Sequence, residues 1–295
     1  MNFILSTLLF LFLGNFALAQ SLFKPEVGDN ESQTFQSSHV LYINHASSLW
    51  DSDATTKDSL NEVLNIAKNS GKFQIFVAVH SPATTYLPAA QNYFVQSPDV
   101  DHTVLSSTGA HRISFPEAKI VVLSGGNLSM CLCEAMRDIV RNGNQDVVPT
   151  LLLVKEAIFD DSLYANKYRL SSPLESWKSF NLTEILSVMD EYSITEYFKN
   201  EIIGNDQFCP HQKMGKDGPL STKEFNFILK DGGKVIGTFG NGTKKISIQL
   251  STVSSFLNKV DEIDNEIGIN QDKRCNNKPA GQNELAPLKT QTVTQ

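Results

Sequence analysis

A cysteine that follows a glycine pair is the feature of this sequence best suited to chemistry. The apolar run 118–123 leads into Gly125 and Gly126, and Cys131 stands where a helix is predicted to begin. A strand that passes through glycines into a helix places the first helical residues at the carboxyl edge of a sheet. The positive end of the helix dipole then favours the thiolate form of a cysteine. Cys131 is therefore the candidate nucleophile.

Two histidines are candidates for activating this thiol. His45 and His80 each follow or end a predicted strand, and a neighbouring imidazole can take the proton of a cysteine directly. The competing interpretation is that both rings only hydrogen-bond nearby loops. With Asp51 and Asp53 they also form a donor set that suits zinc or iron. Their spacing matches no metal motif, so we predict no metal and no other cofactor.

The glycine turn itself is a candidate ligand site. Backbone N–H groups at a helix start bind phosphate or carboxylate groups, and the predicted ligand-binding set is Asn44, Gly125, Gly126 and Asn127. The segment is neither a Walker loop nor a dinucleotide fingerprint. A tight strand-to-helix turn that needs glycine geometry is the alternative interpretation. A glycan on Asn127 would cover the site, because that residue begins an N-x-S/T sequon. The four sequons begin at Asn30, Asn127, Asn181 and Asn241.

The elements that position these residues are predicted to alternate between strands and helices. In chain order the predicted elements are strand 39–44, helix 58–70 ending at Gly71, strand 73–79, strand 119–123, helix 129–141 and strand 150–154. Residues 81–117 are predicted to form a long, mostly irregular connection. A β-α-β alternation of this kind gives a parallel sheet with helices on both faces.

The pattern changes after residue 160. The predicted elements there are helix 182–200, strands 224–229, 234–239 and 244–250, and helix 253–267. Glycine-containing turns at 231–233 and 241–242 separate the three strands, which are therefore predicted to form an antiparallel meander. The predicted fold class is α/β: a three-layer α/β/α domain with a mostly parallel sheet, plus a C-terminal α+β extension.

The segment around the cysteine resembles the isochorismatase-like cysteine hydrolases. The spacing of Gly125, Cys131 and Gly143 matches the spacing in that family, and the resemblance spans residues 38–160. It implies a carboxylate base at the end of the first strand and a lysine that stabilises charge. It also implies that the cysteine attacks a carbonyl or related carbon.

The sequence departs from this family at two of the three catalytic positions. Asn44 stands where the acid belongs, and no lysine occurs over residues 73–118. We therefore predict an exported isochorismatase-like domain that has lost its catalysis and acts by binding a small ligand or a protein partner. The alternative is a cysteine-dependent hydrolase of a small amide- or ether-type substrate, with Cys131 as nucleophile and a histidine as base. Whether the protein is an enzyme stays open.

The N-terminal end predicts export. Residues 3–13 are almost wholly apolar, and the segment closes on a small-x-small cleavage signal at residues 17–19, so residues 1–19 are predicted to be a signal peptide of a secreted or periplasmic protein. No later apolar run is long enough to span a membrane. The predicted organisation is signal peptide 1–19, flexible leader 20–37, isochorismatase-like domain 38–160, α+β extension 161–275 and disordered tail 276–295.

Composition excludes one class of partner. The formal net charge is −7, and the 25 Lys and Arg residues are scattered along the chain. Nucleic acid is therefore not a predicted partner. The identity of the ligand or protein partner and the oligomeric state stay open.

Four cysteines in an exported protein allow two disulfides or leave thiols. Cys131 and Cys133 point about 200° apart on a helix and are not expected to bond each other. They pair with the remaining two cysteines, or at least one of them stays a thiol. The remaining two are Cys209 and Cys275.

Overall fold

A computed structural model gives the structure of the chain. The described residues are 33–34, 37–44, 54–80, 98–106, 113–126, 149–160, 180–198, 225–231, 234–239 and 244–276, with positions 128, 132, 133, 135, 136 and 139. The predicted signal peptide and the tail beyond residue 276 lie outside them. So do several residues of chemical interest, namely His45, Asp51, Asp53, Asn127, Cys131 and Cys209.

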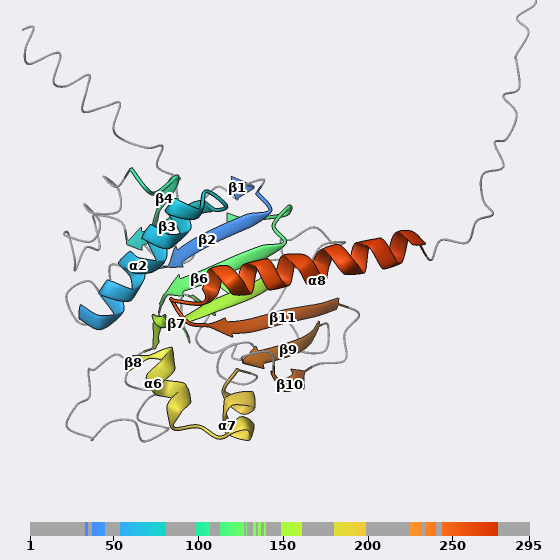
Figure 1. Cartoon of the computed structure of the whole chain (residues 1–295). Coiled ribbons are helices and arrows are strands. Elements are labelled where there is room, and N and C mark those ends of the chain that lie inside the picture. Colours follow the sequence, from blue (N-terminus) through green and yellow to red (C-terminus); the bar gives the residue numbers. More distant parts are fainter. Residues whose placement is uncertain are drawn as a thin grey trace, which may run out of the picture. The chain divides into compact units, whose positions relative to one another are not determined.

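A mostly parallel sheet forms the centre of the described structure (Figure 1). Its order is β10-β9-β11-β7-β6-β2-β3-β4, and every neighbouring pair is parallel except β10 with β9. The prediction of an α/β protein with a mostly parallel sheet is therefore confirmed. The strands are β2 His39–Asn44, β3 Gln74–His80, β4 His102–Ser106, β6 Ile120–Gly125, β7 Thr150–Asp160, β9 Phe225–Asp231, β10 Lys234–Phe239 and β11 Lys244–Ser251. Three further strands have two residues each: β1 Gln33–Thr34 and β5 Ile113–Ser114 pair as a separate two-stranded sheet, and β8 Phe180–Asn181 pairs with β7.

Helix α2 (Ala54–Ser70) covers one face of the sheet (Figure 1). Its buried residues recur at helical spacing, and the helix contacts β3 and β7. Burying each large aliphatic side chain contributes about 1.5–3 kcal/mol. Gly71 follows with a φ of 64°, which is the left-handed conformation that ends a helix. The buried stripe is Leu60, Val63, Leu64 and Ala67.

The opposite face of the sheet carries the larger apolar cluster. Alternate strand residues such as Tyr42 and Phe76 meet Phe115 there, with ring centroids 6.2 and 5.0 Å from it. The described residues that follow β6 complete the cluster, and they are helical: π-helical at 128 and 132 and α-helical at 133, 135, 136 and 139. These buried residues are Leu128, Leu132, Cys133, Ala135, Met136 and Ile139.

Strand β4 and the last part of β7 were not predicted, because their polar and apolar residues do not alternate regularly. The connection 81–117, predicted to be mostly irregular, contains the strands β4 and β5, which the sequence did not predict. β4 reads His-Thr-Val-Leu-Ser, which has no clean polar–apolar period, and it forms the sheet edge beside β3. β7 runs to Asp160 and not to residue 154. A bulge interrupts its apolar pattern, since Leu123 is level with Leu153 but Gly125 with Ile158.

The prediction of a single helix over residues 182–200 was also wrong, because the chain forms two short helices there. α6 (Leu182–Ser187) ends before Asp190, whose side chain accepts the Ser193 N–H at 2.7 Å and begins α7 (Glu191–Glu196). The Ser193 side chain and backbone both hydrogen-bond this carboxylate and hold the pKa of Asp190 below its usual value. An N-cap inside an apolar helical pattern splits the helix.

Helix α6 begins with a reciprocal capping box. Asn181 Oδ1 accepts the Glu184 N–H, and Glu184 Oε2 accepts the Asn181 N–H, both at 2.9 Å. Asn181→Ala is expected to lower the free energy of unfolding by about 1 kcal/mol, because the Glu184 N–H loses its acceptor. Urea denaturation measures the loss. Asn181→Asp keeps the acceptor and serves as the control, and an equal loss in both variants would contradict the capping role.

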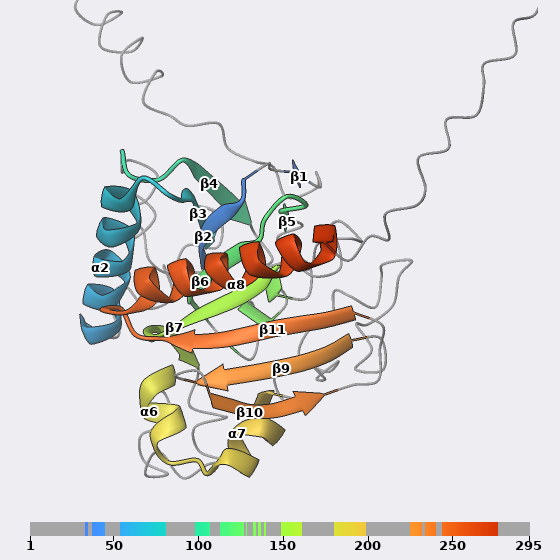
Figure 2. The ribbon, with the colours of Figure 1, turned by 45° about the vertical axis from the view of Figure 1, so that its right-hand side comes forward.

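The predicted antiparallel meander was wrong, although each of its three strands exists. β9 and β10 form the hairpin indicated by the turn at 231–233. β11 then lies on the other side of β9, between β9 and β7 and parallel to both (Figure 2). Residues Ile248, Gln249, Leu250 and Ser251 of β11 are all buried. Burial on both faces suits an interior strand of a parallel sheet and not the outer strand of a meander. The strands β9, β10 and β11, which follow residue 160 in the chain, therefore belong to the same sheet as β2 to β7.

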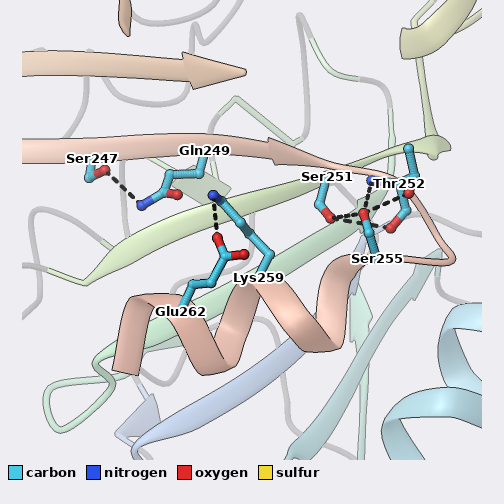
Figure 3. Close-up of polar contacts among 7 residues, drawn as sticks. All are labelled: Ser247, Gln249, Ser251, Thr252, Ser255, Lys259 and Glu262. Carbon is cyan, nitrogen blue, oxygen red and sulfur yellow. Dashed lines mark hydrogen bonds and ion pairs between the residues drawn. The ribbon is translucent and has the colours of Figure 1, made fainter. Parts of the chain in front are cut away.

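The chain divides into two units, Met1–Leu257 and Asn258–Gln295. Helix α8 (Phe256–Asn276) begins three residues later than the predicted helix 253–267 and extends beyond its predicted end. Within the second unit, Lys259 Nζ and Glu262 Oε2 form an ion pair of 2.8 Å along the helix (Figure 3). In the part of the chain that the structure describes, no helix is long and apolar enough to cross a membrane.

Candidate functional site

The winding direction of the sheet changes where β2 meets β6. From β2 the chain passes through α2 to β3 on one side, whereas β6 pairs with β2 on its other side. In open α/β sheets ligands bind outside the carboxyl ends of the strands at such a switch point. The two residues that end these strands, Asn44 and Gly125, are level with each other. The predicted ligand residues Asn44, Gly125 and Gly126 therefore lie together at this edge.

The glycine pair is required by close packing of the backbone. Gly125 has a φ of 88°, and a Cβ there would lie 2.0 Å from the carbonyl oxygen of Asn44. The Gly126 N–H donates to that same oxygen at 2.8 Å. A Cβ on Gly126 would lie 2.3 Å from Cε1 of Phe159. Geometry alone thus accounts for both glycines, so they are not by themselves evidence for an anion site.

Close packing explains the two glycines, but it does not explain why the buried side chain at position 44 is a polar amide. Asn44 is fully buried, and its Nδ2 has no hydrogen-bond partner among the described residues. The Tyr42 hydroxyl donates to Oδ1 over a long 3.4 Å. A buried donor without a partner costs about 1–3 kcal/mol, and in native proteins such a group calls for a water, an ion or a ligand.

Ser124 carries a second buried polar atom without a partner at the same edge. Its Oγ pairs with no other group in the described ranges. Ser124 is level with Ile43, whereas Gly125 is level with Asn44, so Ser124 and Asn44 face opposite sides of the sheet. One ligand group therefore cannot be assigned to both from the strand register.

The predicted catalytic residues are located only in part. His80 ends β3, two residues beyond the position level with Asn44, so its backbone lies at the same edge of the neighbouring strand. The side chain of His80 is not described. Cys131 and His45, like Asn127 of the ligand set, lie outside the described residues. The structure therefore brings together the glycine turn and Asn44, and leaves the proposed nucleophile and base as predictions.

A carboxyl group at this edge was missed by the sequence reasoning. Asp160 is fully buried at the end of β7, where its Oδ2 accepts the Tyr197 hydroxyl at 2.7 Å. Ile158 is level with Gly125, so alternation places Asp160 on the same face of the sheet as Asn44. An acidic residue that ends an apolar run was the available signal. The bulge in β7 concealed it by ending the predicted strand at residue 154.

Hydroxyl groups gather at the carboxyl end of β11 (Figure 3). The Ser255 hydroxyl lies 3.0 Å from that of Ser251 and 2.7 Å from that of Thr252, and it also accepts the Thr252 N–H. Glu156, from the bulged part of β7, accepts the Val253 N–H at 3.0 Å. These groups satisfy one another, so the cluster acts as a cap for the turn into α8.

The contact of Glu156 with this turn has a measurable consequence. Glu156→Ala is expected to lower the free energy of unfolding by about 1–2 kcal/mol, because the Val253 N–H loses its acceptor. Chemical denaturation measures this change. Glu156→Gln retains an acceptor oxygen and should lose less than half as much. Equal losses would show that the charge, and not the hydrogen bond, stabilises the turn.

Of the four cysteines, Cys133 is the one whose side chain the structure describes. Cys133 is buried and present as a thiol rather than in a disulfide. Its burial within the apolar cluster indicates a packing role. Within the described ranges, no three histidine, cysteine or acidic residues gather closely enough to hold a metal ion.

Comparison with known proteins adds no relative: no family model, no curated protein and no solved structure matches this chain.

Proposed function

We propose that this protein is an exported domain of isochorismatase-like type, three-layered with a C-terminal α+β extension, that binds a small ligand and has lost cysteine catalysis. The binding site is the carboxyl edge of β2 and β6. The observation that carries the proposal is Asn44, a fully buried amide whose Nδ2 has no partner in the described structure. An amide cannot take up a proton from a thiol, so it replaces a base with a hydrogen-bonding group.

The position of Asn44 supports binding rather than structural capping. Tyr42, on the same face, and Gly125, level with it, provide close packing but leave Nδ2 unsatisfied. Proteins retain such an unsatisfied donor, although it lowers the stability of the fold, where a ligand accepts its hydrogen bond. Asn44 is therefore expected to lower the stability of the unliganded protein and to favour ligand binding.

Asn44→Leu tests this opposition. We expect it to raise the free energy of unfolding of the unliganded protein by about 1 kcal/mol, because an apolar side chain of similar size removes the unsatisfied donor. It should also abolish the thermal shift given by any small molecule that stabilises the wild type. Differential scanning fluorimetry against a small-molecule library measures both quantities. A loss of stability of several kcal/mol would mean that the amide is paired within the fold, contrary to the proposal.

The alternative function is hydrolysis with Cys131 as nucleophile and His45 or His80 as base. Its support is the helical conformation of the described residues after the Gly125 turn, π-helical at 128 and 132 and α-helical at 133, 135, 136 and 139, which suits a cysteine in the first turns of a helix. Under this alternative, Cys131→Ala abolishes turnover of a small amide or ether substrate. An unchanged rate eliminates it.

Export follows from the apolar N-terminal segment and is tested independently of the site. Mass spectrometry of the protein recovered outside the cytoplasm should give a mature chain that begins near Gln20. An intact chain beginning at Met1 would contradict processing of the segment.

A further inference from the structure

The last of the described strands in the chain lies in the interior of the sheet (Figure 2). β11 pairs with β7 through residues 248–251 and with β9 through residues 244–250. In the described part of the chain, β9 and β10 pair with each other and with β11, and with no other strand. The strand pairing that joins the β9–β10 hairpin to the rest of the sheet therefore runs through β11.

Without β11, residues 151–154 of β7 would form an open edge of the sheet. These four residues, three leucines and a valine, are at most 1% exposed in the folded chain. Leu151 and Leu153 share the larger apolar cluster with Ile248 and Leu250 of β11. An edge that leaves backbone N–H and C=O groups unpaired beside apolar side chains is unfavourable in water. The N-terminal strands therefore need β11 to bury this surface.

A long segment of chain separates β11 from this edge. Ile248 is level with Leu151, and α6, α7 and the β9–β10 hairpin all lie between these two residues in the sequence. Closing so long a loop costs conformational entropy before any contact is gained, which makes non-local parallel pairing slow. The pairing of β11 with β7 is therefore expected to be among the slowest steps of folding.

We propose that β11 is the closing strand of this fold, the strand without which the sheet does not become stable. The proposal builds on the export proposed above and gives the C-terminal position of β11 a role in it. Export channels pass unfolded chains, and a chain that emerges N-terminus first brings its closing strand out late. The sheet then completes after residues 244–251 have crossed the membrane, and the chain stays open during its passage.

Pulsed hydrogen exchange during refolding of the purified wild-type chain from urea tests the order of strand formation. Mass spectrometry of peptides reports when the amides of each strand become protected. The amides of β2, β3, β6 and β7 should gain native protection together with those of β11 or after them. The proposal is overturned if these four strands are protected in a faster phase than β11.

Leu250→Ala supplies the second test. It removes apolar contacts that β11 makes in the rate-limiting step, so refolding should slow about fivefold or more, as stopped-flow circular dichroism measures. Val188→Ala, at a site that is 55% exposed, is the control and should leave the refolding rate within about 1.5-fold. A Leu250→Ala chain that refolds at the wild-type rate and only unfolds faster would place β11 pairing after the rate-limiting step and contradict the proposal. If Leu250→Ala does not fold, Ile248→Val is measured in its place.

Refolding in vitro does not depend on export, so the two proposals fail separately. Early protection of β2 to β7 removes the closing strand and leaves export intact. A chain that is recovered with Met1 still in place removes the proposed export, and with it the role of β11 in translocation.

Discussion

Gly125→Ala is expected to lower the free energy of unfolding by about 3 kcal/mol or more. Two penalties act together, because the residue has a φ of 88° and its new Cβ would lie 2.0 Å from the Asn44 carbonyl oxygen. A non-glycine residue in such a conformation costs about 1–3 kcal/mol, and overpacking a rigid site adds about as much. The neighbour is backbone of a central strand, so it cannot move aside cheaply. Urea denaturation followed by circular dichroism measures the loss.

Gly71→Ala is the matched control for this prediction. Gly71 also has a positive φ, 64°, but a Cβ there meets no atom within 4 Å. It should therefore cost only the conformational part, about 1 kcal/mol. The difference between the two variants isolates the contact between Gly125 and Asn44. Equal losses would mean that β2 and β6 do not approach each other as closely as described.

Tyr197→Phe is expected to lower the free energy of unfolding by about 1–3 kcal/mol. The Tyr197 hydroxyl donates to Oδ2 of Asp160 at 2.7 Å, and both residues are fully buried. Removing the hydroxyl leaves the buried carboxyl group with one donor fewer, and a buried acceptor that loses its donor costs about 1–3 kcal/mol. Chemical denaturation measures the change at constant pH.

Tyr192→Phe controls for the loss of a tyrosine hydroxyl. Tyr192 lies in α7, the helix that ends just before Tyr197, but its side chain is 72% exposed. Its substitution should change the free energy of unfolding by less than about 0.5 kcal/mol. If Tyr197→Phe proves equally neutral, Asp160 has sufficient partners without the hydroxyl, and α7 is not anchored to the end of β7 in this way.

Local pattern predicted β2, β3 and β6 because each of them is a short apolar run, and it missed β4, which is not. His39–Asn44 was predicted as a strand and is observed as β2 with the same bounds, and Gly71 ends α2 with the positive φ of a helix terminator. The same reasoning failed where tertiary contacts decide. β11 is inserted between β7 and β9, and no local turn signal encodes which side of β9 a strand will join.

The sequence predicted the glycine turn of the candidate site, where the backbone geometry requires glycine. It did not predict the buried polar groups, whose role depends on what surrounds them. The close approach of Gly125 to Asn44 needs glycine, so the spacing indicated the turn correctly. The unpartnered Nδ2 could not be inferred, since it depends on what surrounds the side chain in three dimensions. Asp160 was missed for a related reason: the bulge interrupts the apolar pattern of β7, so the predicted strand ended at residue 154, six residues before Asp160.

The rate at which iodoacetamide alkylates Cys131 in the folded wild-type protein tests the central claim, binding without cysteine catalysis, most directly. Peptide mass spectrometry gives that rate below neutral pH, with N-acetylcysteine as the reference thiol. The account predicts that Cys131 is alkylated no faster than the reference, or is held in a disulfide, because Asn44 cannot take its proton. Alkylation many times faster than the reference below neutral pH would reveal an activated thiolate and contradict the account.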